Sequence, residues 1–226
     1  MSQVDTLERW LTFMEQNNID DDRIYANLAK IDSVRLKKWL SRLDRVEQLK
    51  CGPSKKRKEF EGQRSRVKGA LYEKIVDTVV RGVSCFQSWT NVQSSTNELD
   101  ILVVLGPRAV FIPALRKWGS HCICECKYHT SYVKTDWVTK LNTVLQTHNA
   151  NVGVLFSRKG LSRGGPSARV RHQLQLLAVS AQARFIVCFS REDLVECTNG
   201  TNFLRLLVSR FVEMQIGAEK LALLAG

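Results

Sequence analysis

The spacing of apolar residues changes along the chain and predicts its secondary structure. Between residues 64 and 81 they recur every three or four positions, as in an amphipathic helix. After it, short apolar runs typical of strands alternate with helical spacing. The predicted strands are 83–92, 99–105, the run around Glu125, 152–156 and 185–189, and the predicted later helices are 135–148, 166–181, 191–197 and 201–215. This order predicts an α/β fold with a mixed central sheet flanked by helices.

The first 49 residues follow a different pattern, without strand signals. Their apolar residues fall into two groups with helical spacing, namely Leu7, Trp10, Leu11 and Met14, then Leu36, Trp39, Leu40 and Leu43. Asp32 and Ser33 are placed to cap the second of these helices. We therefore expect a small helical accessory unit at 1–49, a basic linker at 50–63 and an α/β domain at 64–226.

Charge is distributed unevenly over the same regions. The chain of 226 residues has a net charge of +12, of which residues 1–49 carry −1 and residues 50–68 carry +6. Lys and Arg gain affinity for polyanions by releasing counterions from phosphates, so this balance favours a nucleic-acid partner. The nearly neutral first 49 residues favour a packing or dimerisation element, or a docking site for a partner protein, over a DNA-reading helix.

Cysteine usage and the lack of long apolar runs indicate an intracellular protein. The seven cysteines are odd in number and form no CxxC pair, which favours reduced thiols. No run reaches the length that spans a bilayer, and the N-terminus lacks the apolar core of a signal peptide. The sequence therefore predicts a cytoplasmic protein, or a nuclear one in a eukaryote, with no membrane partner.

Two basic segments are candidates for phosphate contacts. The first contains Lys55, Lys56, Arg57 and Lys58, and the second, after the strand at 152–156, contains Arg158, Lys159, Arg163 and Arg169. Contacts from such loops would hold nucleic acid without reading its sequence. Both segments are equally compatible with ordinary solvated loops, and the first also with a nuclear-localisation signal.

The run from His121 to Lys127 places a carboxylate and an ammonium two residues apart. Side chains alternate along a strand, so Glu125 and Lys127 share a face with Ile123, and cysteines 122, 124 and 126 line the other face. Burying charge is costly unless it is paired or binds a metal, so this pair indicates a site. A zinc site would draw on His121, Cys122, Cys124, Cys126 and His129. We disfavour it, because consecutive positions on one strand face rarely complete a tetrahedron.

Two further acids precede this pair in the chain. Glu73 lies at the edge of the apolar side of the helix at 64–81, and Asp100 enters the strand at 99–105. If the two strands pair, Asp100 and Glu125 can converge on Mg²⁺, or on Mn²⁺ in its place, with the backbone carbonyl of Cys126 as another oxygen ligand. Lys127 would stabilise developing charge, which favours phosphodiester hydrolysis. Taken singly, these residues fit an ordinary helix acid, a turn residue and a salt bridge.

Three motifs in this order resemble the PD-(D/E)xK nuclease superfamily, nearest to Mrr-like restriction endonucleases and archaeal Holliday-junction resolvases. They are Gly-Ala-Leu-Tyr-Glu73, Asn-Glu-Leu-Asp100-Ile-Leu and Glu125-Cys126-Lys127, and the resemblance covers about residues 64–197. It implies a restriction endonuclease-like core and Mg²⁺-dependent DNA cleavage. By the family pattern Asp100 and Glu125 are metal ligands, Lys127 is the catalytic lysine, and Glu73 supports the metal or a water.

The chain departs from the family pattern at two places. Leu99 precedes Asp100 where the family pattern has proline, and 24 residues separate Asp100 from Glu125. The long connection leaves room for an extra strand at 109–112. Neither departure removes a catalytic group.

The sequence therefore predicts a metal-dependent DNA endonuclease that acts in restriction of foreign DNA or on branched DNA. One alternative is a non-catalytic DNA-binding or scaffold subunit, against which the intact four residues argue. Another is a ribonuclease or single-strand nuclease that uses the same metals, because phosphate-directed chemistry and basic loops fit both polymers. Because one active site cuts one strand at a time, cleavage of both DNA strands favours a homodimer.

Overall fold

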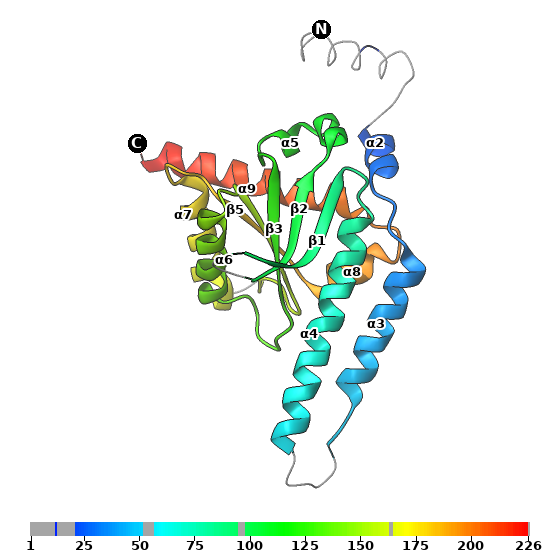
Figure 1. Cartoon of the computed structure of the whole chain (residues 1–226). Helices are drawn as coiled ribbons and strands as arrows, with labels where there is room; N and C mark the ends of the chain where they lie inside the picture. The colour runs from blue at the N-terminus through cyan, green and yellow to red at the C-terminus, as the bar shows by residue number, and fades with distance from the viewer. Residues whose placement is uncertain (1–11, 13–20, 52–56, 95–97, 163–164, 226) are drawn as a thin grey trace.

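The fold is built on a five-stranded mixed sheet (Figure 1). The computed structural model describes residue 12 and residues 21–51, 57–94, 98–162 and 165–225. The strands lie across the sheet in chain order: β1 (Phe86–Gln93), β2 (Glu98–Leu105), β3 (His121–Lys127), β4 (Val152–Ser157) and β5 (Phe185–Phe189). β1, β2 and β3 pair antiparallel, whereas β3, β4 and β5 pair in parallel. The predicted α/β class, a mixed sheet flanked by helices, is confirmed.

Helices bury both faces of the sheet in two apolar clusters. The first cluster joins the sheet to α3 (Ser33–Gln48), α4 (Arg57–Arg81), α8 (Arg191–Cys197) and α9 (Phe203–Ala225). The second joins it to α6 (Thr135–Thr147) and α7 (Ala168–Val179). The shorter helices are α2 (Asp21–Leu28), η1 (Pro107–Phe111), α5 (Pro113–Arg116) and η2 (Gly165–Ser167). No helix in the described residues is long and apolar enough to span a membrane.

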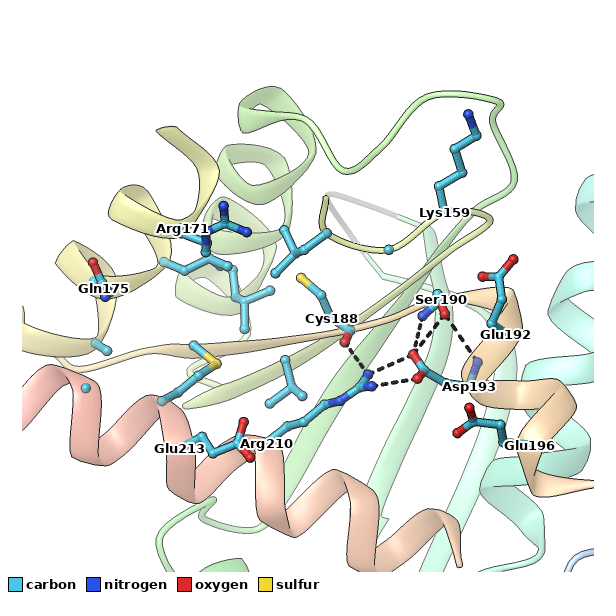
Figure 2. A pocket seen from close by; sticks show the side chains of 18 residues that line it. Lys159, Arg171, Gln175, Cys188, Ser190, Glu192, Asp193, Glu196, Arg210 and Glu213 are labelled. Carbon is cyan, nitrogen blue, oxygen red and sulfur yellow. Dashed lines mark hydrogen bonds and ion pairs between the residues drawn. The ribbon is translucent and has the colours of Figure 1, made fainter. Parts of the chain in front are cut away.

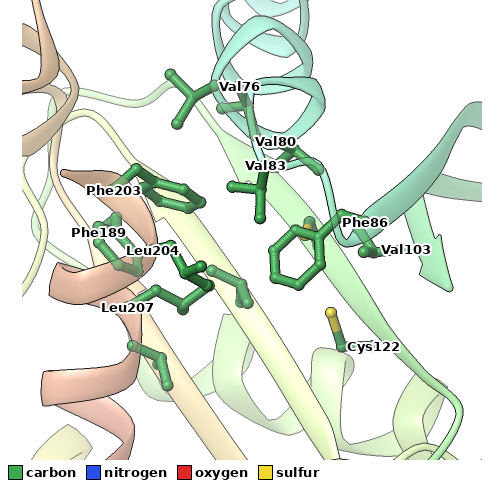
Figure 3. Close-up of a cluster of buried hydrophobic side chains, with 14 of the residues drawn as sticks. Val76, Val80, Val83, Phe86, Val103, Cys122, Phe189, Phe203, Leu204 and Leu207 are labelled. Carbon is green, nitrogen blue, oxygen red and sulfur yellow. The ribbon is translucent and has the colours of Figure 1, made fainter. Parts of the chain in front are cut away.

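The alternation of side chains along the strands explains the two clusters. On β3, Cys122 and Cys124 point into the first cluster, and Ile123 points into the second. Figure 3 shows the first cluster, where Cys122 lies near Phe86 of β1 and residues of α4 and α9 close the core. All six residues of β4 are buried, as expected for a parallel strand covered on both faces. All seven cysteines are free thiols.

The N-terminal helices share the first cluster with the sheet. Asp32 accepts a hydrogen bond from the N–H of Arg35 at 2.9 Å, which confirms the predicted cap of α3. Leu36 and Leu43 of α3 are fully buried in the same cluster as the residues of α4. α4 begins at Arg57 rather than at 64. The first predicted helix, with Leu7, Trp10, Leu11 and Met14, lies outside the described residues, apart from residue 12.

The segment expected as an extra strand is not one. Residues 109–112 fall within and just after the 3-10 helix η1, which precedes the short helix α5. Pro107 and Pro113 occupy the first positions of these two helices. Proline has a fixed φ and no N–H, so it suits a helix start and cannot donate to a sheet ladder. The prediction at 109–112 was therefore wrong.

An ion pair ties β5 and α8 to α9. Arg210 makes two hydrogen bonds to Asp193, at 2.6 and 2.8 Å, and donates to the carbonyl of Cys188 (Figure 2). Asp193 also accepts from the N–H of Ser190 in the capping box of α8. Burial alone would raise the pKa of Asp193, but the hydrogen bonds and charge of Arg210 hold that pKa below its usual value.

We predict that Asp193→Asn lowers the free energy of unfolding at pH 7 by about 2 kcal/mol, because it removes a charged hydrogen-bond partner of Arg210. The folded-state pKa of Asp193 is lowered, so the stabilisation is present above the unfolded pKa of about 3.9 and is lost as pH falls through the folded pKa. Urea unfolding at pH 7 and at pH 3 would measure the variant's deficit, which should shrink at pH 3.

The exposed pair between Arg205 and Asp22 supplies a matched control. Asp22→Asn should change the unfolding free energy little, because exposed ion pairs contribute at most about 1 kcal/mol. An equal loss of unfolding free energy in both variants would contradict the stabilising role of the pair between Asp193 and Arg210. A deficit of Asp193→Asn that does not depend on pH would contradict it as well.

Candidate functional site

The candidate site lies where β2 and β3 stop pairing. Their antiparallel register runs from Val104 opposite His121 to Ile101 opposite Cys124 and ends there. Beyond that point the N–H of Cys126 donates to the side chain of Asp100, with 2.7 Å from N to Oδ2. β3 continues beside β4 as far as Lys127 opposite Ser157. The two strands thus separate while the Asp100 carboxylate bridges the gap between them.

A kink in the β1–β2 hairpin accompanies this separation. Thr90 pairs with Ile101 and Val92 with Leu99, but Asn91, between them, has a φ of 52° in the left-handed region. A regular pleat would place Leu99 and Ile101 on one face. Instead Leu99 lies in the second apolar cluster and Ile101 in the first. The backbone therefore changes face at Asp100, which turns this side chain toward the end of β3.

Glu125 and Lys127 form an ion pair at the end of β3. Glu125 is 6% exposed, and its Oε1 also lies 3.8 Å from Nζ of Lys140 on α6. Burial alone would lower the pKa of Lys127, but its hydrogen bond to Glu125 and the nearby acids raise that pKa above the usual value of lysine. Lys127 is therefore held as a cation beside Glu125, with the negative charge of Asp100 nearby.

Lys140 is a site residue that sequence reasoning missed. It lies three residues after Trp137 and four before Val144, both on the apolar side of the predicted helix at 135–148. That spacing puts Lys140 on the flank of the helix that faces the sheet. The spacing identifies Lys140 only as a cation on that flank, and the structure places it beside Glu125.

Glu73 approaches the same cluster from α4. It is half-buried, and burial is the main cause that raises its pKa. The negative charges of Asp100 and Glu98 raise this pKa further, whereas Lys127 lowers it. The preceding residue fixes this part of the helix: the hydroxyl of Tyr72 donates to the carbonyl of Ser157 at 2.9 Å, and its ring lies 4.8 Å from that of Tyr128. Glu73 is thus carried by a helical turn that is anchored to the end of β4.

The acids of the site repel one another. Burial raises the pKa of Asp100, and the charge of Glu125 raises it further. The thiol of Cys126 has its pKa raised by burial and then by Asp100 and Glu73, so it stays neutral. Negative charge therefore accumulates around Glu73, Asp100 and Glu125, with Lys127 and Lys140 as the neighbouring cations. A further cation would relieve this repulsion.

The donor set suits a hard divalent cation only in part. Asp100 and Glu125 offer carboxylate oxygens beside the backbone of Cys126. Mg²⁺ prefers such oxygens and keeps several waters, so two carboxylates are enough for it. Among the described residues no group of three or more His, Cys, Asp or Glu is placed to hold a metal. The zinc alternative at His121, Cys122, Cys124, Cys126 and His129 gains no support from this arrangement.

The proposed phosphate contacts are spread over several elements. Arg57 and Lys58 are exposed at the start of α4, and Arg169 is exposed on α7. Lys159 is exposed, with its Nζ 5.1 Å from the ring centre of Tyr132. Arg158 instead turns inward, because it pairs with Glu47 of α3 at 2.9 Å and lies over the ring of Tyr128. Lys55, Lys56 and Arg163 lie outside the described residues.

A cavity of about 580 Å³ lies away from this cluster, between β5, α7, α8 and α9 (Figure 2). Its lining includes the paired Asp193 and Arg210 and contains none of Glu73, Asp100, Glu125 or Lys127. The acids that gather where β2 and β3 separate are therefore outside this cavity.

Searches of protein-family models, curated proteins and solved structures found no match to this chain.

We predict that Mg²⁺ stabilises the protein through Asp100 and Glu125. Linkage and the size of the chain give a rise in Tm of about 3 °C when free Mg²⁺ is about ten times its Kd. Asp100→Asn and Glu125→Gln should each abolish the rise, because each removes a charged oxygen ligand. Differential scanning fluorimetry with increasing Mg²⁺ would measure it.

Glu196→Gln is the matched control. Glu196 is an exposed acid of α8 and does not belong to the cluster of Glu73, Asp100 and Glu125. It should keep the full rise in Tm. A rise that persists in Asp100→Asn and Glu125→Gln would place the bound Mg²⁺ elsewhere.

Proposed function

We propose that this chain is a metal-dependent DNA endonuclease of the PD-(D/E)xK superfamily, in the branch of Mrr-like restriction endonucleases and Holliday-junction resolvases. One observation carries the proposal. Asp100 and Glu125 come together from neighbouring strands, with Lys127 paired to Glu125 and Glu73 approaching from α4. These are the four residues, in chain order, that the family pattern assigns to catalysis.

The central sheet supports the same proposal. A restriction endonuclease-like core is a mixed sheet with helices on both faces, and this chain has a five-stranded mixed sheet covered in that way. Asp100 and Glu125 lie just past the end of the antiparallel pairing of β2 with β3. Fold by itself does not imply function, so the proposal depends on the four side chains rather than on the sheet.

The proposed cofactor is Mg²⁺, with Mn²⁺ as a substitute. Asp100, Glu125 and the carbonyl of Cys126 would hold it, and Glu73 would act directly or through a water. When bound, the ion would neutralise the attacked phosphate and lower the pKa of a water nucleophile. The raised pKa of Asp100 and of Glu73 supports this assignment, because it arises from burial and crowded negative charge that a divalent cation would offset.

Lys127 has the properties that a catalytic lysine needs. Its pKa is raised, so it stays protonated at neutral pH, and Glu125 fixes its position. In this position Lys127 would hold a phosphate oxygen or orient the attacking water, and so stabilise the charge that develops during hydrolysis. Lys140, which also approaches Glu125, is a second cation for the same phosphate.

DNA is the proposed substrate because the chain is strongly basic and the site resembles DNA-cleaving enzymes. The proposed setting is restriction of foreign DNA in defence or processing of branched DNA, in the cytoplasm or in a eukaryotic nucleus. A homodimer would supply the second active site that cleavage of both strands requires.

We predict that purified protein cleaves supercoiled plasmid or a four-way junction with Mg²⁺ or Mn²⁺ and not with EDTA. Asp100→Ala and Lys127→Ala should each lower the cleavage rate at least about a hundredfold, as the loss of one transition-state contact does. Gel assays with plasmid, single-stranded DNA, junction DNA and RNA would measure the rates. Lys134→Ala, at an exposed lysine before α6, should cleave like the unchanged protein.

Other outcomes would redirect the assignment. Preferential cleavage of RNA or single-stranded DNA would favour the alternative nuclease with the same metals. DNA binding without cleavage under any metal would favour the non-catalytic scaffold. Cleavage that survives in both Asp100→Ala and Lys127→Ala would show that the site lies elsewhere.

A further inference from the structure

The paired helices α3 and α4 project beyond the end of the sheet where the candidate site lies. Tyr72 of α4 is bonded to Ser157, the last residue of β4, so the part of α4 from Arg57 to Leu71 extends past the strand ends. At 1.5 Å per residue this part is about 21 Å long. Figure 1 shows α3 running beside it over the same region. We call α3 and residues 57–73 of α4 the basic arm.

Helices α3 and α4 together hold half of the net charge of the protein, and most of that charge lies in the basic arm. α3 has five basic and two acidic residues, and the whole of α4 has seven and four, which gives +6 of the total of +12. The cations at the start of α4 belong to the predicted basic segment, whereas the positive charge of α3 was not foreseen from the sequence. Seven of the nine acids in residues 1–49 precede α3, and their charge masks that of the helix when the whole segment is averaged.

The acids of α3 face the body of the protein, which leaves its outer side basic. Asp44 pairs with Arg191 of α8, and Glu47 pairs with Arg158 after β4. The exposed cations Lys38 and Arg45 lie two helical turns apart and form no ion pair with an acid of the described residues. Tertiary contacts thus neutralise the inner side of α3 and concentrate positive charge on the outer side.

The outer side of α4 continues this surface toward the site. Lys58 and Arg66 are exposed and lie on the same side of the helix as Glu73, because at 3.6 residues per turn Arg66 is about 20° and Lys58 about 60° from Glu73 around the helix axis. No acid of the described residues pairs with either of them. A chain of phosphates that lies against Lys58 and Arg66 would therefore be directed toward Glu73.

We propose that the basic arm binds the phosphate backbone of a DNA duplex and delivers it to the candidate site. The choice of DNA rests on the proposed function. The duplex is favoured over a single strand because single strands are held largely by bases that stack on exposed aromatic rings. The exposed large apolar residues of the described arm and its end are Val34, Leu49 and Val67, which are all aliphatic.

Two aromatic rings of the basic arm, those of Trp39 and Phe60, lie against cations. The ring of Trp39 has Arg42 at 4.9 Å and Lys74 at 5.3 Å from its centre, and the ring of Phe60 has Arg64 at 5.8 Å. These contacts hold the basic side chains of α3 and α4 together at the surface. They favour a binding mode that is directed at phosphates and independent of sequence.

Charge reversal on each helix tests this inference. Lys38→Glu with Arg45→Glu changes α3, and Lys58→Glu with Arg66→Glu changes α4. Fluorescence anisotropy with a labelled duplex of about 20 base pairs in EDTA, at several salt concentrations, would measure affinity without cleavage. We expect each double variant to bind at least about tenfold more weakly, and the dependence of log K on log salt to fall by about 2.

The matched control reverses two exposed cations at the opposite end of the sheet, Arg108→Glu with Lys117→Glu. It makes the same change in net charge and should bind the duplex nearly as well as the unchanged protein. Equal losses in all three double variants would overturn the inference, because they would reflect net charge alone. Thermal melting of each variant checks that it is folded, and the two arm variants alter separate helices.

Two further comparisons decide the partner and separate the two proposals. If arm reversal weakens binding to single-stranded DNA or to vesicles of anionic lipid but leaves duplex binding intact, the duplex is the wrong partner. If the arm binds duplex DNA but no metal supports cleavage, this inference stands and the proposed nuclease falls. If DNA is cleaved and arm reversal leaves affinity unchanged, the nuclease stands and this inference falls.

Discussion

The hydrogen bond from the N–H of Cys126 to Asp100 allows β2 and β3 to separate. A buried backbone N–H is costly to leave without a partner, and in a continuous antiparallel ladder a backbone carbonyl of β2 would accept it. Here a carboxylate takes the place of that backbone carbonyl. The ladder can therefore end at Ile101 and Cys124, and the acids of both strands face one another across the opening. The kink at Asn91 belongs to the same local departure from a regular pleat.

Where β2 and β3 separate, the interactions among the buried acids are unfavourable in the protein without a ligand. Glu125 is nearly inaccessible and is stabilised by Lys127, while burial and mutual repulsion raise the pKa of Asp100 and of Glu73. A fold selected for stability alone would gain from replacing one of these acids with a neutral residue. Crowded carboxylates beside a fixed ammonium are consistent with the proposed cationic cofactor and anionic substrate.

Two arginines that join α3 to the rest of the protein also determine where positive charge lies on its surface. Arg158, expected at the surface, pairs with Glu47, and Arg191 pairs with Asp44. Both acids belong to α3, so the tertiary contacts remove negative charge from this helix and leave Lys38 and Arg45 outward. The proposed role in DNA binding therefore moves from the loop after β4 toward the α3–α4 pair, which projects beyond the proposed catalytic cluster.

The sequence by itself determined the order and type of most elements, because they depend on the local spacing of apolar residues. β5 and α8 have the predicted bounds, and the strands of Asp100 and Glu125 pair, which was the condition for bringing the two acids together. The segment at 109–112 failed because two prolines outweighed its apolar character. Only the tertiary structure decided that Asp100 bonds to Cys126, that Lys140 approaches Glu125, and that α3 turns its acids inward. Each of these contacts joins residues distant in the chain, and local spacing carries no information about which distant group satisfies a buried charge or donor.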